Sequence, residues 1–369
     1  MMIHHMTTST TAPSETRWSL YTSPTTTWEA IFAACEQATQ SIDLEQFIFV
    51  DDEIGRKLLD ICATKAQQGV RVRLLWDGAG SFNLFGNFLI SELSQKHIQV
   101  AFFNTILPRA FHNHRWWFFR NHRRSIVIDK TIAFTGSFSI WEKTKEWRDT
   151  TVRIEGSIVA SIEASFEVMW ARAHNIKTDW SARAVSSEDG FSYVTNSPVP
   201  GKQFLYHRII DAIRNARSYI CITTPYFVPD RRLIRVLRLA ARRNVLVQII
   251  IPESSDHPVV DLGAESYFHV LLTAGVKIFR IKQPLIHSKS IVIDDDWATI
   301  GTMNLDSVSL HYNFEANIVS NKREFVEEIK TIFYQDLEIA TEVQPHIWES
   351  RPFTQKWLEF LVRFVRTFL

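Results

Sequence analysis

The segments FRNHRRSIVID (residues 119–129) and LIHSKSIVIDD (residues 285–295) contain the same five letters, SIVID, about 165 residues apart. In each segment a histidine is followed two positions later by a basic residue and then by the pentapeptide, which ends on an aspartate. These residues are His122, Arg124 and Asp129 in the first segment and His287, Lys289 and Asp294 in the second. A duplication of this length indicates that two similar halves make up the chain.

The sequence around the two segments repeats as well. Each half contains helical patterns alternating with strands, such as IDLEQFIFVDDE and VRVRLLWD in the first half and YICITTPYFVPD and VLVQIIIP in the second. Strands that alternate with helices predict an α/β fold, in which each of two tandem lobes contains a mixed sheet flanked by helices. We expect the two lobes to be related by a pseudo-two-fold axis.

The domain boundaries follow from this repeat. A polar, Ser-rich stretch containing Pro198 and Pro200 separates the halves. The predicted parts are a disordered N-terminal segment (1–20), a first lobe (21–185), a linker (186–200), a second lobe (201–342) and a C-terminal amphipathic helix (343–369).

Composition narrows the class of protein. A chain of 369 residues is too long for one typical core. Its net charge of +1 is low for a dedicated nucleic-acid binder. Cys35, Cys62 and Cys221 lie far apart, which favours neither a disulfide framework nor a zinc site. The polar N-terminus predicts no signal peptide, and no apolar run approaches the roughly 18 residues of a membrane span.

The repeated residues suit phosphodiester chemistry. Residues i and i+2 of a strand share a face, so His122 accompanies Arg124 and His287 accompanies Lys289. One histidine can attack phosphorus and become a phosphohistidine, while the other protonates the leaving alcohol and then activates the acceptor. The two cations hold the phosphate oxygens. Asp129 and Asp294, which complete the repeated pattern, are predicted to belong to the same catalytic set. The sequence contains no metal-ligand motif, so neither a metal nor another cofactor is expected.

Small polar residues follow each aspartate. In TGSFS and GTMNLD, glycine is followed by hydroxyl and amide side chains that can approach a ligand closely. The predicted phosphate or substrate ligands are Ser137, Ser139, Thr302 and Asn304.

These residues resemble the phospholipase D superfamily, whose mark is two HKD motifs. The likeness covers roughly residues 27–342, and the flanking stretches RNHRRSIVIDKTIAFTGS, TTPYFVPD and IHSKSIVIDDDWATIGTMNLD are most similar to bacterial cardiolipin synthases. The resemblance implies a phosphatidyltransferase that converts two molecules of phosphatidylglycerol into cardiolipin and glycerol. It also implies that His122 is the nucleophile and His287 the general acid and base.

The resemblance further implies that Asp149 and Glu315 orient the histidines, since a carboxylate on Nδ1 fixes the imidazole tautomer. The alternative for Asp149 is a salt bridge with its neighbour Arg148. Two positions depart from the family pattern, because Arg124 replaces a lysine and Ser139 replaces an asparagine. Arginine keeps the charge but is planar and is not an equivalent point charge, so an altered activity is one alternative.

Two segments are candidates for membrane contact. The stretch RPFTQKWLEFLVRFVRTFL (351–369) has the spacing of an interfacial amphipathic helix, or of a helix packed on the core. The stretch LPRAFHNHRWWFFRNHRR (107–124) suits lipid headgroups, single-stranded nucleic acid or a strand entering the site. We expect a peripheral monomer on the cytoplasmic face of the bacterial inner membrane, with phosphatidylglycerol as substrate and no nucleic-acid partner.

Two other functions remain open from the sequence. One is hydrolysis within the same superfamily, either of phospholipid to phosphatidic acid or of nucleic acid, although near-neutral charge argues against a nuclease. The other is a catalytically weak lipid-binding protein, which the departures at Arg124 and Ser139 would explain.

Overall fold

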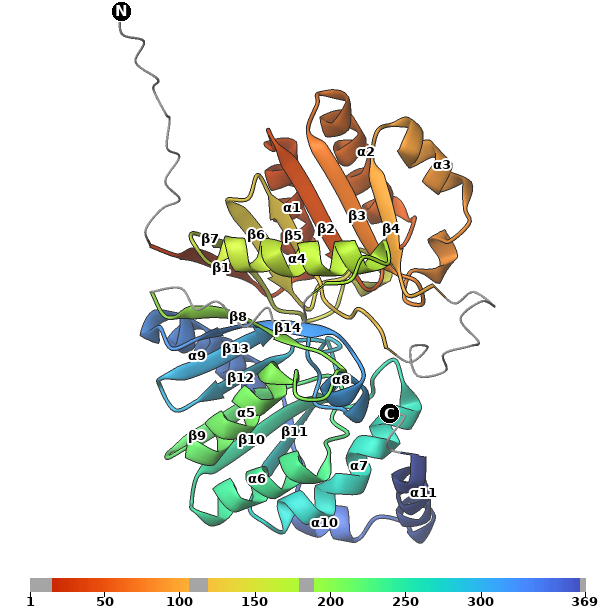
Figure 1. Ribbon diagram of the computed structural model, residues 1–369. Coiled ribbons are helices and arrows are strands. Elements are labelled where there is room, and N and C mark those ends of the chain that lie inside the picture. Colours follow the sequence, from red (N-terminus) through yellow and green to blue (C-terminus); the bar gives the residue numbers. More distant parts are fainter. Residues whose placement is uncertain (1–14, 106–118, 179–188, 366–369) are drawn as a thin grey trace, which may run out of the picture.

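The computed structural model describes residues 15–105, 119–178 and 189–365. Two lobes are stacked on one another, and each is built on a sheet covered by helices (Figure 1). The first lobe is formed by the N-terminal half of the chain and the second lobe by the C-terminal half.

The first lobe contains a seven-stranded sheet in the order β1-β7-β6-β5-β2-β3-β4. β2, β3 and β4 are parallel, whereas β5, β6, β7 and β1 continue the sheet in antiparallel pairs. The inner strand β3 is almost entirely buried, as expected where helices cover both faces of a sheet. The strands are β1 (Arg17–Tyr21), β2 (Ser41–Gln46), β3 (Arg71–Asp77), β4 (Gln99–Phe103), β5 (Ser125–Ile128), β6 (Ile132–Gly136) and β7 (Thr151–Glu155).

The second lobe contains an eight-stranded sheet in the order β15-β11-β10-β9-β12-β13-β14-β8. β9, β10 and β11 are parallel, and the other strands pair in antiparallel fashion. The strands are β8 (Phe191–Asn196), β9 (Tyr219–Thr223), β10 (Leu246–Pro252), β11 (Lys277–Ile281), β12 (Ser290–Ile293), β13 (Trp297–Gly301), β14 (Glu315–Ser320) and β15 (Thr341–Glu342).

The two sheets have the same topology apart from β15. β2, β3 and β4 correspond to β9, β10 and β11, and β5, β6 and β7 correspond to β12, β13 and β14. The edge strands β1 and β8 each pair with the last strand of their antiparallel set. The predicted fold class, with two tandem lobes that each contain a mixed sheet and flanking helices, is therefore confirmed.

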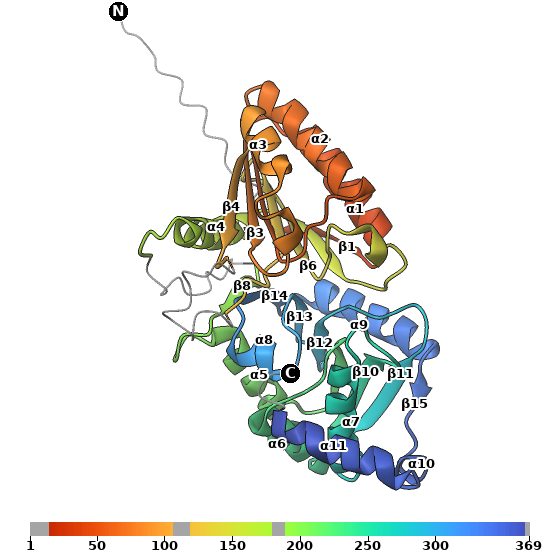
Figure 2. The same ribbon diagram turned by 90° about the vertical axis from the view of Figure 1, so that its right-hand side faces the viewer.

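Helices cover the sheets. In Figure 2, α1 and α2 lie on one side of the first sheet and α4 on the other. Aspartate side chains cap the start of three described helices, because Asp52 accepts the N–H of Gly55 at 3.0 Å, Asp230 that of Leu233 at 2.8 Å and Asp306 that of Ser309 at 2.7 Å. The helices are α1 (Pro24–Glu36), α2 (Glu53–Gln67), α3 (Phe88–Gln95), α4 (Val159–Ala173), α5 (Phe204–Asn215), α6 (Arg231–Arg242), α7 (Pro258–Leu272), α8 (Ser307–His311), α9 (Arg323–Glu338), α10 (Pro345–Glu349) and α11 (Phe353–Val365), with 3-10 turns η1 (Phe82–Leu84) and η4 (Glu142–Thr144).

The lobes share a hydrophobic core. Val127 of β5 and Val152 of β7 belong to one buried cluster with Val292 of β12, Ile300 of β13 and Ile318 of β14. Burial of this apolar surface from both halves stabilises one fixed arrangement of the lobes. The arrangement brings the starts of β5 and β12, and hence the two repeated segments, to the same place.

The structure corrects two predicted boundaries. Residues 17–20, expected to be disordered, belong to β1, because Trp18 and Leu20 pack against the shared core. Residues 191–196, expected to be a linker, form β8, in which Phe191 is fully buried. Residues 1–14 of the predicted disordered segment and 186–188 of the predicted linker lie outside the described residues.

The C-terminal segment also differs from its prediction. Residues 343–369 were predicted to form one helix, but the described part contains α10 and α11. Pro352 lies between them and lacks the N–H that a continuous helix would need. Residues 366–369 lie outside the described part. Within that part, no helix has the length and apolarity required to cross a membrane.

Candidate active site

The two predicted catalytic histidines lie where the lobes meet. Both are buried, with His122 just before β5 and His287 just before β12. The backbone N–H of His122 donates to the carbonyl of Phe314 in the second lobe at 3.0 Å. That of His287 donates to the carbonyl of Arg148 in the first lobe at 2.7 Å. Each histidine segment is therefore paired with the segment of the opposite lobe that carries a predicted orienting carboxylate.

The carboxylates reach the histidines across the lobe boundary. Nδ1 of His122 lies 2.9 Å from both carboxylate oxygens of Glu315, and Nδ1 of His287 lies 3.0 Å from Oδ2 of Asp149. A carboxylate only accepts hydrogen bonds, so each Nδ1 carries the proton and each Nε2 presents its lone pair. The structure thus pairs the first histidine with the second lobe's carboxylate and the second histidine with that of the first lobe.

Asp149 is held as an anion. Burial alone would raise its pKa, but the adjacent His287, Lys289 and a hydroxyl donor together lower that pKa below the ordinary value. The alternative of a salt bridge between Asp149 and Arg148 is wrong, because Arg148 donates to Asp336 at 2.7 Å.

Hydroxyl groups support both carboxylates. Ser137 donates to Asp149, and Thr302 donates to Glu315. Both hydroxyls also contact a backbone carbonyl of the neighbouring strand. Ser137 and Thr302 were predicted to bind substrate phosphate; in the structure their hydroxyls face the carboxylates, and phosphate binding by them stays a prediction. Glycine precedes each of them because a Cβ there would collide with the neighbouring strand rather than with a ligand.

A buried cation lies at the Nε2 atom of each histidine. An Nη2 nitrogen of Arg124 is 3.2 Å from Nε2 of His122, and the Arg124 Nη1 group donates to the carbonyl of Ser137 at 3.0 Å. Nζ of Lys289 is 3.0 Å from Nε2 of His287 and 2.7 Å from the carbonyl of His287. Both cations contact the atom that would attack phosphorus or transfer a proton, which places them where phosphate oxygens would lie.

Burial and mutual repulsion act on the charges of this site. Burial, together with the nearby Arg124, lowers the pKa of Lys289 well below its ordinary value. Burial and the charge of Lys289 lower the pKa of His287 to about 4, although Asp149 opposes the shift. Burial also lowers the pKa of His122, against the opposing effect of its carboxylate partner. Both imidazoles are therefore neutral at pH 7.

Ser139 and Asn304 occupy equivalent positions but have different surroundings. The backbone carbonyl of Ser139 accepts the indole N–H of Trp28 at 2.8 Å. Nδ2 of Asn304 donates to Ser309 at 3.3 Å, while its Oδ1 is buried without a hydrogen-bond partner in the described part of the chain. A buried amide oxygen without a partner favours a ligand donor at this position, so Asn304 remains a predicted substrate ligand.

The aspartates that end the repeated pentapeptides lie away from the histidines. Asp129 follows β5 and accepts the backbone N–H groups of residues 39–41 at 2.7–2.8 Å. Asp294 follows β12 and accepts those of residues 217–219 at 2.8–3.0 Å. These contacts assign both residues to the support of the strand entrances, which corrects the prediction that they act in catalysis.

Aromatic rings beside the histidines were missed. The ring centroid of Phe47 lies 4.8 Å from that of His122, and the centroid of Trp147 lies 5.0 Å from that of His287. A comparison of the two halves does not single out either residue, because the counterpart of Trp147 is Asn313 and that of Phe47 is Pro225. Their only signal was position, since Trp147 comes two residues before a predicted carboxylate.

No cluster of side chains that could hold a metal ion occurs among the described residues.

The aromatic and basic segment predicted for headgroup contact falls mostly on residues 106–118, which lie outside the described ranges. The last residues of this segment lead into the site. There the side-chain amide of Asn121 donates to Glu45 at 2.7 Å, and the backbone N–H of Asn121 donates to Asp77 at 2.8 Å.

Two lobes that each supply a histidine, a cation and a carboxylate to one shared site define the phospholipase D class of proteins. A family model described as "Cardiolipin synthase, PLD-like domain" matches residues 31–170 and 209–337. The chain therefore belongs to the cardiolipin synthase family of phospholipase D-like proteins.

Curated relatives agree with this assignment. Cardiolipin synthase 1 of Bacillus anthracis is 30% identical over 97% of this chain and 74% of its own length. A cardiolipin synthase of Geobacillus sp. is 33% identical over 93% of this chain and 70% of its own length. The sequence-based prediction of a phosphatidyltransferase of this superfamily is confirmed.

A solved structure shares the fold. Phosphatidylserine synthase of Haemophilus influenzae superposes with a TM-score of 0.74 over 95% of both chains, at 14% sequence identity. At this identity the match concerns the arrangement of the two lobes alone.

Proposed function

We propose that the chain joins two molecules of phosphatidylglycerol into cardiolipin and glycerol, with His122 as nucleophile and His287 as general acid and base. The observation that carries the proposal is a pair of neutral imidazoles, each fixed by a carboxylate on Nδ1 and each with a cation at Nε2. Such a pair supplies one attacking nitrogen and one proton carrier on the same phosphate.

In the first step, Nε2 of His122 forms a bond to phosphorus while the bond from phosphorus to the glycerol oxygen breaks. The leaving oxygen takes a proton from Nε2 of His287. Glu315 stabilises the positive charge that His122 acquires, as Asp149 does for the protonated His287. Arg124 and the lysine of the second motif stabilise the charge on the phosphate oxygens.

In the second step, the hydroxyl of another phosphatidylglycerol loses its proton to His287 and attacks phosphorus. The bond between phosphorus and Nε2 of His122 breaks, and the histidine is restored. Exclusion of water from the buried site favours the lipid alcohol over hydrolysis.

The first step requires a proton on His287, whose pKa of about 4 in the free protein disfavours it. The causes are burial and the charge of Lys289. A bound phosphodiester carries a negative charge and offsets the repulsion from Lys289 and Arg124. Substrate binding therefore raises the pKa of His287, so that its Nε2 takes up a proton from solvent as the substrate binds.

Product analysis tests the reaction. Purified protein is incubated with phosphatidylglycerol vesicles in the presence of EDTA, and the lipids are identified by mass spectrometry. Cardiolipin with an equal amount of glycerol is the expected result, and it would also establish that no metal is needed. Phosphatidic acid as the sole product would identify a hydrolase, and an EDTA-sensitive reaction would contradict the metal-independent mechanism.

We also propose that the protein is a monomer bound peripherally at the cytoplasmic face of the bacterial inner membrane. α11 supports this, because Phe353 is 72% exposed, Trp357 51% and Leu358 50%. Its opposite face is packed, since Glu359 is buried and pairs with Arg351 at 2.7 Å. Deletion of residues 353–369 is expected to weaken vesicle co-sedimentation, and unchanged binding would contradict the role of this helix.

A further inference from the structure

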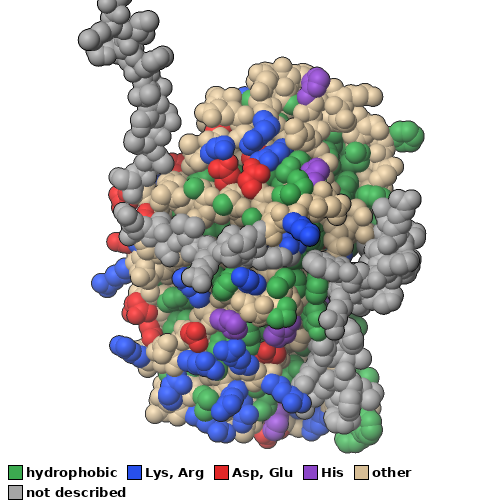
Figure 3. Space-filling model, in the orientation of Figure 1, with side chains coloured by type: hydrophobic (Ala, Val, Ile, Leu, Met, Phe, Trp, Pro, Cys, Tyr) green, Lys and Arg blue, Asp and Glu red, His purple; other side chains and the backbone are tan. Residues whose placement is uncertain are grey.

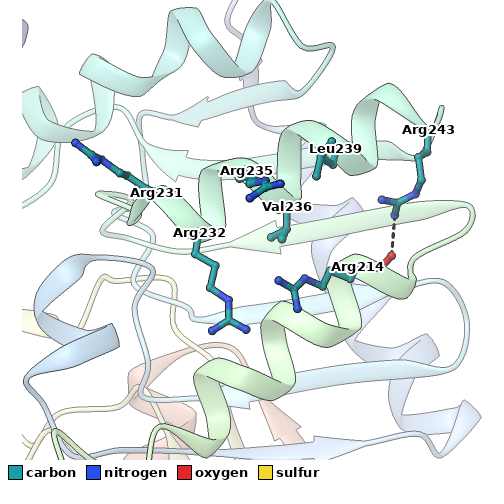
Figure 4. A pocket seen from close by; sticks show the side chains of 7 residues that line it. All are labelled: Arg214, Arg231, Arg232, Arg235, Val236, Leu239 and Arg243. Carbon is teal, nitrogen blue, oxygen red and sulfur yellow. Dashed lines mark hydrogen bonds between the residues drawn. The ribbon is translucent and has the colours of Figure 1, made fainter. Parts of the chain in front are cut away.

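A groove between α5 and α6 on the outer side of the second lobe is lined almost entirely by arginine. Its volume is about 590 Å³. Figure 4 shows guanidinium groups from both helices along it, with short aliphatic side chains between them. The lining residues are Arg214, Arg231, Arg232, Arg235, Val236, Leu239 and Arg243.

Most of this charge is not balanced within the protein. Arg231, Arg232 and Arg235 have no ion pair among the described residues. Of the bordering carboxylates, Asp211 balances only Arg214 of the groove, at 3.4 Å. Asp230 accepts hydrogen bonds from a tyrosine, a histidine and its own helix. Like charges held this close repel one another, so the groove favours binding of an external anion.

A second groove in the first lobe provides a comparison. Its volume is similar, about 560 Å³, but its charged lining residues are balanced. Three acidic residues and three basic residues line it, namely Glu36, Glu53, Asp60, Arg56, Lys57 and Lys65. Unbalanced positive charge therefore belongs to the α5–α6 groove and is not a general property of the surface of this nearly neutral chain.

We propose that the α5–α6 groove binds the phosphate groups of an anionic bilayer and holds the second lobe on the membrane. Three observations favour a bilayer over a nucleic acid. Leu239 in the groove is 43% exposed and Leu246 nearby is 41% exposed, which suits contact with the apolar part of an interface. The lining contains no aromatic side chain for base stacking.

The third observation is the position of α6. Figures 1 and 2 both place α6, α10 and α11 at the end of the second lobe that points away from the first lobe. The arginine groove and the exposed aromatic side chains of α11 thus belong to the same end of the molecule. Figure 3 shows Lys and Arg side chains gathered over this lobe. Basic and aromatic groups at one end of a molecule are a combination that suits binding to anionic interfaces.

This inference extends the proposed function by naming the surface that faces the membrane, and it can be tested without the reaction. The full chain and the variant R231Q/R232Q/R235Q are compared by co-sedimentation with phosphatidylcholine vesicles that contain or lack phosphatidylglycerol. These three arginines make no hydrogen bond or ion pair in the described structure, and only Arg232 has a ring contact, 5.6 Å above the centroid of Tyr206. The variant should therefore keep its fold, which circular dichroism checks. The matched control, K57Q/K65Q/K143Q, removes the same charge from the first lobe.

The arginine variant is expected to bind phosphatidylglycerol vesicles about 10- to 100-fold more weakly, with the difference reduced at high salt. The control should bind as the wild type does. Turnover of a soluble short-chain phosphatidylglycerol should be the same in all three proteins, because the groove is remote from the site between the lobes. If the substrate is not turned over at all, the proposed function fails while the binding comparison still stands.

Equal vesicle binding by the arginine variant and the wild type would overturn the inference. Equal losses in the variant and the control would also overturn it, since they would indicate a general effect of net charge. A variant that keeps vesicle binding but loses affinity for an oligonucleotide would identify the groove as a nucleic-acid site instead.

Discussion

The half-sites around His122 and His287 have the same connections but different chemistry. In each, a hydroxyl supports a carboxylate, the carboxylate holds Nδ1 and a cation lies at Nε2. Glu315 places both oxygens 2.9 Å from its histidine, whereas Asp149 uses one oxygen for its histidine and the other for Ser137. A duplicated fold can therefore supply two histidines with different proton affinities, which a two-step transfer requires.

The cations differ in a complementary way. Arg124 keeps its proton under all ordinary conditions. It donates a hydrogen bond to the carbonyl of Ser137, and its other terminal nitrogen lies beside Nε2 of His122. Lys289 has a pKa well below its ordinary value, owing to burial and then to Arg124, so its charge responds to what binds nearby. The arginine that departs from the family pattern thus supplies a fixed charge, while the lysine supplies a variable one.

The largest effect is expected from loss of either histidine. His122→Ala and His287→Ala should each lower turnover by about 10⁴-fold or more. A phosphodiester with a nitrophenol leaving group needs no proton in the first step, so it should restore the first step in His287→Ala alone. Mass spectrometry of that variant should then find the phosphatidyl group on His122. Its detection on His287 in the other variant would reverse the assigned roles.

The next largest effect is expected from the orienting carboxylates. Glu315→Gln and Asp149→Asn should each lower kcat by about 10²- to 10⁴-fold, because the tautomer and the imidazolium lose their support. Each carboxylate raises the pKa of its histidine, so removal lowers that pKa. With His122 as nucleophile, Glu315→Gln moves the acid limb of the kcat profile to lower pH.

The aspartate variant is the matching half of this test. With His287 as the acid, Asp149→Asn should move the alkaline limb of the kcat profile to lower pH, because the protonated form is lost sooner. Exchange of the two limbs between the variants would mean that the histidines have the opposite roles. A loss of kcat without movement of either limb would reduce both carboxylates to structural residues.

The features that the sequence predicts correctly are those with a local and duplicated signal. The repeat predicted both lobes, the mixed sheets and the residues that the structure brings together around the two histidines, including Arg124 and Lys289. It left out Phe47 and Trp147, whose counterparts in the other half are not aromatic. A comparison between halves finds what the halves share, and these rings belong to the differences between them.

The sequence did not determine which group some side chains contact or which way their hydroxyls point, and the reasons are physical. Asp149 is adjacent to Arg148 in the chain, yet its partner is His287 in the other lobe. Ser137 and Thr302 were expected to face substrate, but tight packing of their strands turns the hydroxyls onto the carboxylates. These contacts depend on how the lobes pack together, and no spacing within one segment encodes that.

A moderate effect is expected when the cation of the first half-site is altered. Arg124→Lys restores the family pattern and keeps the charge but gives up the bond to the carbonyl of Ser137, so turnover should fall by only about five- to tenfold. Arg124→Met removes the charge, and a loss of about 10²- to 10³-fold is expected. Steady-state kinetics with soluble substrate distinguish the two, and equal losses would show that geometry matters more than charge.

The smallest effect on turnover is expected at Asp129, although it belongs to the repeated pattern. Its carboxylate accepts three backbone N–H groups at the start of β2. Because Asp129 makes these contacts and not contacts with the histidines, it affects them only by stabilising the fold. Asp129→Ala should therefore lower the free energy of unfolding by about 1–3 kcal/mol while kcat stays within about twofold of wild type. Asp294→Ala is the matched control in the other lobe and should behave in the same way. Denaturant unfolding and kinetics measured on the same samples separate the two effects, and a large loss of kcat in a fully folded Asp129→Ala protein would return this aspartate to the catalytic set.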